Sequence, residues 1–160
     1  MRFTMKGSQK VIDKLNELLT LEMTAVDLYF LYSRLFEDWG MTKLHAQYDH
    51  EKDDEGIHCD LLIKRIIFLE GQANVADRAG FSIKTNVKEI LKQSLKYEED
   101  VVSKTKEAII LCEKESDFAT RETLLTILKD SEEDHIDWLE TQLTIIENIG
   151  LERYIQTMSN

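Results

Sequence analysis

The chain has 160 residues, of which 42% are hydrophobic and 32% charged, with no proline, six glycines and a formal net charge of −11 at pH 7. This length suits one domain over residues 1–160 with a sizeable core, and nothing in the composition breaks long helices. The acidic balance argues against nucleic acid or an anionic membrane as a partner and favours the attraction of cations.

The cysteines and the apolar runs indicate in which cellular compartment the protein lies. Cys59 and Cys112 lie far apart and form no Cys-x-x-Cys pair, which fits a reducing cytosol and excludes a rubredoxin-type iron site. The sequence shows no signal-type apolar segment near its start and no apolar run long enough to span a membrane. We therefore expect a cytoplasmic protein.

Hydrophobic periodicity predicts four long helices and a short fifth one. Their expected ranges are about 8–39, 42–70, 86–115, 118–149 and 151–158. The short connection between the first two predicts an antiparallel hairpin. Residues 72–85 form the only long irregular stretch, which indicates the single long crossover of a ferritin-like four-helix bundle. The predicted fold class is therefore all-α.

Two Glu-x-x-His motifs carry the candidate chemistry. Glu55 and His58 form the first, on the second predicted helix, and Glu132 and His135 form the second, on the fourth. Positions i and i+3 share one face of a helix, so each motif presents a carboxylate and an imidazole side by side. One such motif alone is a weak signal, because most pairs of this kind are solvated surface.

Two further glutamates strengthen that signal. Glu22 and Glu98 interrupt the apolar stripes of the first and third predicted helices, and a carboxylate buried there must be neutralised or bound to something. The helix midpoints fall near residues 24, 56, 101 and 134, so both motifs and both glutamates are expected in one layer of the bundle. By contrast, Glu133 and Asp134 are expected to face water.

Four carboxylates and two neutral imidazoles suit two divalent iron or manganese ions better than a closed structural zinc site. We hypothesise that Glu22 and His58 bind one iron, that Glu98 and His135 bind the other, and that Glu55 and Glu132 bridge them. A salt-bridge role for the buried glutamates is the structural alternative.

The chain resembles the bacterioferritins over nearly its whole length. The resemblance is carried by Met5-Lys6-Gly7, Lys10-Val11-Ile12, Tyr29-Phe30-Leu31, Phe68-Leu69-Glu70-Gly71 and His135-Ile136-Asp137-Trp138-Leu139-Glu140. It implies a ferroxidase centre with the six ligands above, ferric mineral storage, and a homo-oligomeric cage of 24 subunits built from two-fold dimers. It also implies that Tyr29 lies beside the centre and that His50 and Asp54 match an inner-surface iron site.

One departure from the family concerns haem. Bacterioferritins have a haem-binding methionine directly after the first bridging glutamate, where this chain has Gly56. Haem binding by this subunit in the family's manner should therefore fail, and Cys59, one turn further on, is expected to be a small core residue rather than a substitute. Two alternatives remain open: a haem-free cage, or a mixed cage whose second subunit type supplies the methionine.

A second departure lies in the fourth helix. Asp130-Ser131-Glu132 is one residue longer than the family's usual run, and we expect a local π-bulge near residues 128–131 to absorb the extra residue.

The sequence thus favours an iron-storage ferroxidase that uses O₂ or H₂O₂ as the oxidant. A di-iron peroxidase or oxidase of the erythrin type, which removes peroxide without storing iron, is the main alternative. It would share the bundle and the ligands, but the chain has no Cys-x-x-Cys electron-transfer module. A non-catalytic cage subunit is a third alternative, against which the complete ligand set counts.

Overall fold

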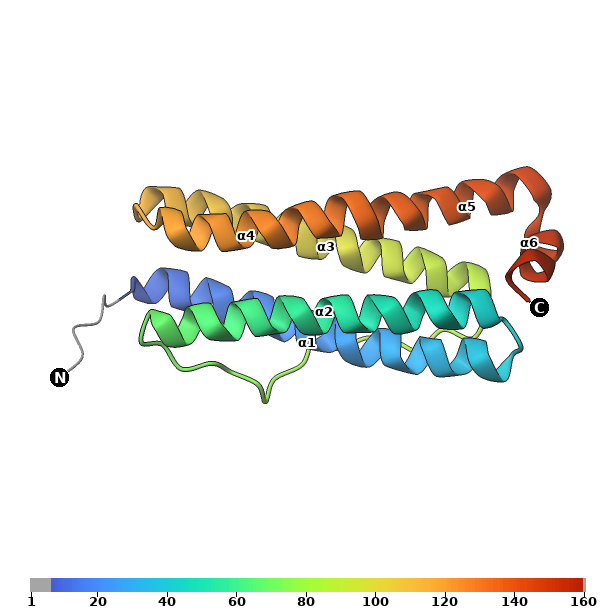
Figure 1. The fold of residues 1–160 in the computed structure, drawn as a ribbon, viewed down its shortest axis with the longest axis horizontal. Helices are drawn as coiled ribbons and strands as arrows, with labels where there is room; N and C mark the ends of the chain where they lie inside the picture. Colours follow the sequence, from blue (N-terminus) through green and yellow to red (C-terminus); the bar gives the residue numbers. More distant parts are fainter. Residues whose placement is uncertain (1–6, 160) are drawn as a thin grey trace.

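The computed structural model describes residues 7–159, which form helices and no strand (Figure 1). Met5 and Lys6, which belong to the family resemblance, lie outside the described residues. The segments, in chain order, are α1 (Gln9–Asp38), α2 (Thr42–Phe68), α3 (Val87–Lys114), α4 (Phe118–Asp130), the π-helix η1 (Ser131–Ile136), α5 (Asp137–Ile149) and α6 (Leu151–Met158). The all-α prediction is confirmed, and each predicted helix boundary agrees to within two residues.

Two helical hairpins make the bundle. α1 and α2 are joined by a tight turn in which Gly40 has a φ of 76°, a left-handed conformation that glycine adopts without steric cost. α3 is followed, after a turn containing Ser116, by the long rod of α4, η1 and α5. The hairpins lie one above the other, and α6 turns across one end of the bundle (Figure 1).

The crossover between the hairpins follows α1 along the bundle, as the sequence predicted. Side chains of α1 form hydrogen bonds with its backbone at several points along its length. Asn16 bonds to Gln72 and Asn74, Thr24 Oγ1 accepts from the amide of Ala79 at 2.9 Å, and the hydroxyl of Tyr32 accepts from the amide of Lys84 at 2.9 Å. A segment without helix or sheet satisfies its backbone groups in this way. The crossover lets α3 start at the end of the bundle where α2 also starts.

The apolar core is divided into two clusters. One surrounds Tyr32, Phe36 and Tyr48 near the α1–α2 turn, and the other surrounds Leu15, Leu62 and their neighbours towards the opposite end. A layer of buried ionisable side chains lies between them along the sequence of each long helix. The bundle therefore places its polar groups near mid-height, where the helix midpoints predicted them.

The fourth predicted helix contains the expected irregularity. The segment Ser131–Ile136 is π-helical, flanked by regular α-helix on both sides. This confirms a π-type irregularity, which begins at the last residue of the predicted range of 128–131 and continues to residue 136. A π-helix pairs residues five apart instead of four, so it accommodates one extra residue and rotates the residues upstream of it relative to those downstream.

Every helix in the described part of the chain is too short or too polar to cross a lipid bilayer.

Candidate metal centre

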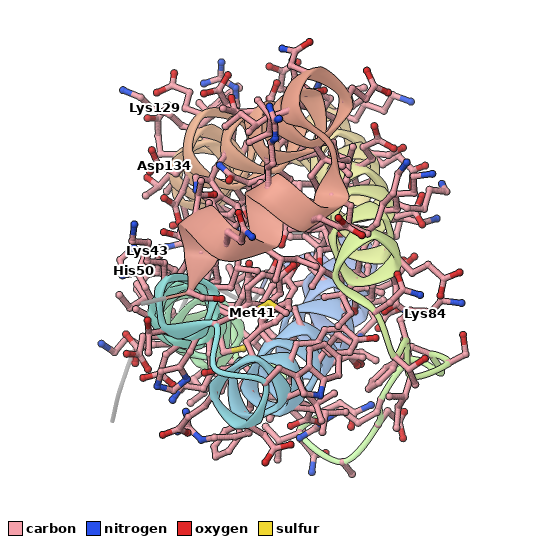
Figure 2. All side chains as sticks on the ribbon, turned by 90° about the vertical axis from the view of Figure 1, so that its right-hand side faces the viewer. Met41, Lys43, His50, Lys84, Lys129 and Asp134 are labelled. Carbon is pink, nitrogen blue, oxygen red and sulfur yellow. The ribbon has the colours of Figure 1, made fainter. Side chains whose placement is uncertain are left out.

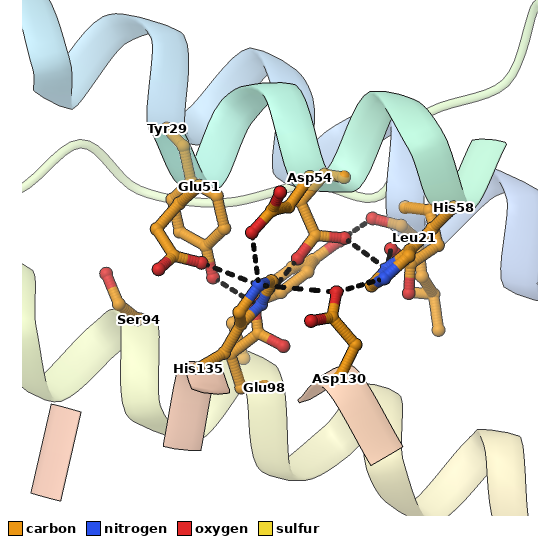
Figure 3. Close-up of polar contacts among 12 residues, drawn as sticks. Leu21, Tyr29, Glu51, Asp54, His58, Ser94, Glu98, Asp130 and His135 are labelled. Atoms are coloured by element: carbon orange, nitrogen blue, oxygen red, sulfur yellow. Dashed lines mark hydrogen bonds and ion pairs between the residues drawn. The ribbon is translucent and has the colours of Figure 1, made fainter. Parts of the chain in front are cut away.

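Five ionisable side chains from both hairpins meet in the layer between the two core clusters. Each of them is at most 2% exposed. They are Glu22 of α1, Glu55 and His58 of α2, Glu98 of α3 and His135 of η1. Their convergence brings together five of the six metal ligands that the sequence suggested (Figure 3).

The two imidazole rings face the inner carboxylates through their Nδ1 atoms. His58 Nδ1 lies 3.1 Å from Glu22 Oε2 and 3.3 Å from Glu55 Oε2. His135 Nδ1 lies 3.0 Å from Glu55 Oε1 and 3.5 Å from Glu98 Oε1. The rings stack with their centroids 5.9 Å apart. Glu55 thus directs one carboxylate oxygen towards each histidine, so its carboxylate belongs to the ligand-type groups around both.

Two carboxylate oxygens inside this cluster are buried without a hydrogen-bond partner among the described residues. They are Glu22 Oε1 and Glu98 Oε2, whose sister oxygens face the histidines. Leaving a buried polar atom unpaired costs roughly 1–3 kcal/mol, so these two oxygens indicate a further partner inside the cluster. Three sets of three ligand atoms in the described part of the chain are close enough to hold an ion. Two of them lie inside the cluster: Glu22, Glu55 and His58, and Glu55, Glu98 and His135. The third, Glu51, Asp54 and His135, lies on the outer side of His135. Carboxylate oxygens with one imidazole nitrogen per set fit iron or manganese.

Without a metal, the cluster holds protons. Burial lowers the pKa of His58, but hydrogen bonds to Asp130, Glu22 and Glu55 outweigh it and raise that pKa to about 12. The pKa of His135 is likewise raised, because its contacts with nearby carboxylates outweigh its burial. Burial and the neighbouring Glu55 raise the pKa of Glu22 well above its usual value. Protonated imidazoles and a protonated carboxyl therefore balance the buried charges.

The Nε2 atoms of both histidines point the other way, towards a second group of carboxylates. His58 Nε2 lies 2.6 Å from Asp130 Oδ2, and His135 Nε2 lies 2.7 Å from Glu51 Oε2 and 3.5 Å from Asp54 Oδ2. The sequence alone indicated no role for Glu51 or Asp130. Glu51 lies four residues before Glu55, so its position on the same face of α2 could have been predicted from the sequence spacing. Asp130 faces His58 only because of the π-helix.

Glu132 was expected in the core layer, and that placement is wrong. Its side chain is 42% exposed and lies 3.8 Å from Lys106 Nζ. The cause is the π-helix, in which the residues sharing a side with His135 lie four and five positions upstream instead of three and four. Ser131, four positions upstream, is accordingly buried, and Asp130, five positions upstream, points at the histidines. The structure therefore does not bring Glu132 together with the other predicted ligands.

Tyr29 is the expected neighbour of the cluster. It is buried, and its hydroxyl donates a hydrogen bond of 2.5 Å to Glu98 Oε1. Burial and the charge of Glu98 raise the pKa of Tyr29 well above its usual value, so it remains a hydrogen-bond donor.

His50 and Asp54 lie on the outer side of His135. His50 Nε2 is 3.1 Å from Asp54 Oδ2, and the His50 side chain is 64% exposed. His50 also lines an open pocket between α2 and the η1–α5 segment, together with Glu51, Glu133, Asp134 and Asp137. His50 and Asp134 lie on the same side of the bundle (Figure 2). The outer carboxylates thus connect the buried histidines with an acidic surface.

Gly56 and Cys59 lie on different surfaces of α2. Gly56 is exposed, and a Cβ atom added there would meet nothing within 4 Å. Close packing within the described part of the subunit therefore does not require a glycine here. Cys59 is buried in the core cluster around Leu15 and Leu62, where Ile66 also lies, as a small core residue should be.

The family model described as a ferritin-like domain matches residues 12–149. A protein of Synechocystis named "Bacterial ferritin" is 45% identical over 96% of this chain and 98% of its own length. Proteins named "Bacterioferritin" from Brucella melitensis and Mycolicibacterium paratuberculosis are 45% and 37% identical, over 95% and 94% of this chain and 94% of their own lengths. Matches over nearly the whole chain show that it belongs to the ferritin family, as its resemblance to the bacterioferritins predicted.

Proposed function

We propose that this protein stores iron and oxidises Fe²⁺ to Fe³⁺ at a two-iron centre within each subunit. One observation carries the proposal: Glu55 directs its two oxygens towards the Nδ1 atoms of His58 and His135. This completes two adjacent three-ligand sets that share one carboxylate. The reported relatives are named as ferritins, which supports storage over the erythrin-type alternative.

The proposed ligands follow the two sets. Glu22 and His58 hold one iron, Glu98 and His135 hold the other, and Glu55 bridges them. The proposed set leaves out Glu132, because its side chain lies outside the cluster beside Lys106. Tyr29, hydrogen-bonded to Glu98 Oε1, would hold that carboxylate in place.

Two Fe²⁺ ions bound side by side can together supply the two electrons that reduce one H₂O₂, with two protons, to two water molecules. The protein's part is to bind both substrate ions at adjacent positions and to release its own protons as they bind. The acidic pocket at His50, Glu133 and Asp134 offers Fe²⁺ a route towards the outer carboxylates.

Storage requires an assembly. We propose a cage of 24 subunits built from two-fold dimers, in which the ferric product collects as mineral. Large apolar side chains exposed on the isolated subunit support association, because they are half or more exposed on its surface: Ile57, Ile67, Val75, Ile83, Ile110 and Phe118.

The storage proposal predicts a particle of several hundred kDa, since each subunit has a mass of 18.7 kDa. Size-exclusion chromatography with light scattering at physiological salt measures this mass, and iron loading should add a dense mineral core visible by electron microscopy. A subunit or dimer that never assembles further would contradict storage.

Replacement of Glu98 by alanine should remove one side of the centre. We expect fast Fe²⁺ oxidation, followed by absorbance under stopped flow, to slow by more than ~10-fold. Loss of a residue that only supports a metal ligand typically costs at least that much, and loss of a ligand itself should cost more. Glu99→Ala is the matched control, because Glu99 is the exposed neighbour of Glu98. Glu132→Ala should behave like this control. A Glu98→Ala variant with the wild-type rate would defeat the ligand assignment.

Metal binding should release protons. With the pKa of His58 at about 12 and that of His135 also raised, both imidazoles carry a proton on each nitrogen at pH 7, and a metal must displace the proton on Nδ1. Titration of Zn²⁺ into metal-free protein in weak buffer should therefore release more than one proton per subunit, read with a pH indicator. The His58→Ala variant should release fewer. Zn²⁺ binding without acidification would contradict the protonated cluster.

We propose that this subunit alone binds no haem, because Gly56 offers no ligand atom. Gly56→Met should introduce one into open space, and the assembled variant should acquire a haem Soret band when reconstituted with haem. Gly80→Met is the control, since Gly80 also has open space around it but lies in the crossover. A Soret band in the wild-type protein purified alone would overturn this proposal.

A further inference from the structure

Asp130 occupies a position that the proposed two-iron centre does not explain. Its carboxylate lies at the end of α4, directly before the π-helix, and its side chain is 29% exposed. Asp130 Oδ2 lies 2.6 Å from Nε2 of His58, which is buried (Figure 3). This is the shortest contact that either histidine makes with a carboxylate in the described part of the chain.

The two nitrogens of His58 have different partners. Nδ1 faces Glu22 and Glu55, the side on which three ligand atoms converge. Nε2 faces Asp130 on the opposite edge of the ring. An imidazole that binds a metal through one nitrogen carries its proton on the other, and a carboxylate that accepts this proton fixes the tautomer and the ring orientation.

We propose that Asp130 is a positioning residue, which accepts a hydrogen bond from Nε2 of His58 and holds Nδ1 towards the metal bound by Glu22 and Glu55. The proposal rests on the two-iron centre proposed above and adds a residue outside its ligand set. Asp130 acts through His58 and does not touch the metal.

The surroundings of His135 show why Asp130 matters more to the metal site at His58 than to the site at His135. Nε2 of His135 has three carboxylates within reach: Glu51 at 2.7 Å, Asp54 at 3.5 Å and Asp130 at 3.8 Å. Nε2 of His58 has Asp130 as its carboxylate partner among the described residues. Loss of Asp130 therefore leaves Nε2 of His135 with two carboxylates and Nε2 of His58 with none among the described residues.

The π-helix makes this arrangement. Asp130 stands five residues before His135, which is the π-helical spacing. In a regular α-helix, the residues on the side of His135 would be Glu132 and Ser131, and Asp130 would turn away from it. The same rotation that removes Glu132 from the cluster thus supplies the carboxylate behind His58.

The test is Co²⁺ binding to metal-free protein under anaerobic conditions, followed by ligand-field absorption and calorimetry. Wild-type protein should bind two Co²⁺ per subunit. Asp130→Ala should weaken one of the two binding steps by ~10–100-fold, the usual cost of losing an outer partner of a metal-bound histidine, and should leave the other step within a few-fold. Asp130→Asn, which keeps a neutral acceptor oxygen, should give an intermediate loss.

Glu122→Ala is the matched control, because Glu122 is an exposed acidic residue of α4, the helix that ends at Asp130, and its removal changes the net charge equally. Circular dichroism and particle mass check that each variant folds and assembles. If Asp130→Ala does not fold, the nearly isosteric Asp130→Asn keeps the test open.

The outcomes separate the two proposals. Equal Co²⁺ affinities in Asp130→Ala and Glu122→Ala, beside normal two-ion binding by the wild type, would overturn the role of Asp130 alone. A wild-type protein that binds no pair of Co²⁺ ions would overturn the two-iron centre itself. In a crystal structure of the Zn²⁺-loaded protein, Asp130 on Nε2 of His58 supports the proposal, and Asp130 bound directly to zinc contradicts it.

Discussion

The bundle depends on how it satisfies five ionisable groups in its interior. Three carboxylates and two imidazoles are each at most 2% exposed, and an isolated buried charge is too costly to persist. The cost is lowered because acids and bases alternate around the cluster, with each Nδ1 atom between two carboxylates. Both hairpins supply members of this cluster, so their relative height is set by a polar contact as well as by apolar packing.

Much of this arrangement was predictable from the sequence. Glu22 and Glu98 interrupt apolar stripes, and Glu55 with His58 follows the i, i+3 spacing of an α-helix, so their burial in one layer follows from helix geometry. The crossover was equally readable, because residues 72–85 lack helical periodicity and the chain must return along the bundle.

The error at Glu132 has a physical cause. Predicting which residues of the fourth helix face the core assumes a constant number of residues per turn. The six-residue π-helix η1 has more residues per turn, so that assumption fails there. The extra residue in the run before His135 predicted a π-type irregularity but not which side chains it would rotate inward. Because of the π-helix, Asp130 faces the histidines and Glu132 faces Lys106. The sequence does not reveal where the irregularity begins, so the orientation of these two residues follows only from the three-dimensional structure.

The division of the core into two apolar clusters has a mechanical consequence. The bundle is packed by Tyr32, Phe36 and Tyr48 at one end and by Leu15 and Leu62 at the other, while its middle is joined by ion pairs whose geometry is adjustable. Carboxylates and imidazoles can then reorganise around an arriving or departing cation without loosening either end. Rearrangement is therefore expected in the layer that would bind the proposed iron ions, while the apolar packing at both ends keeps the helices in place.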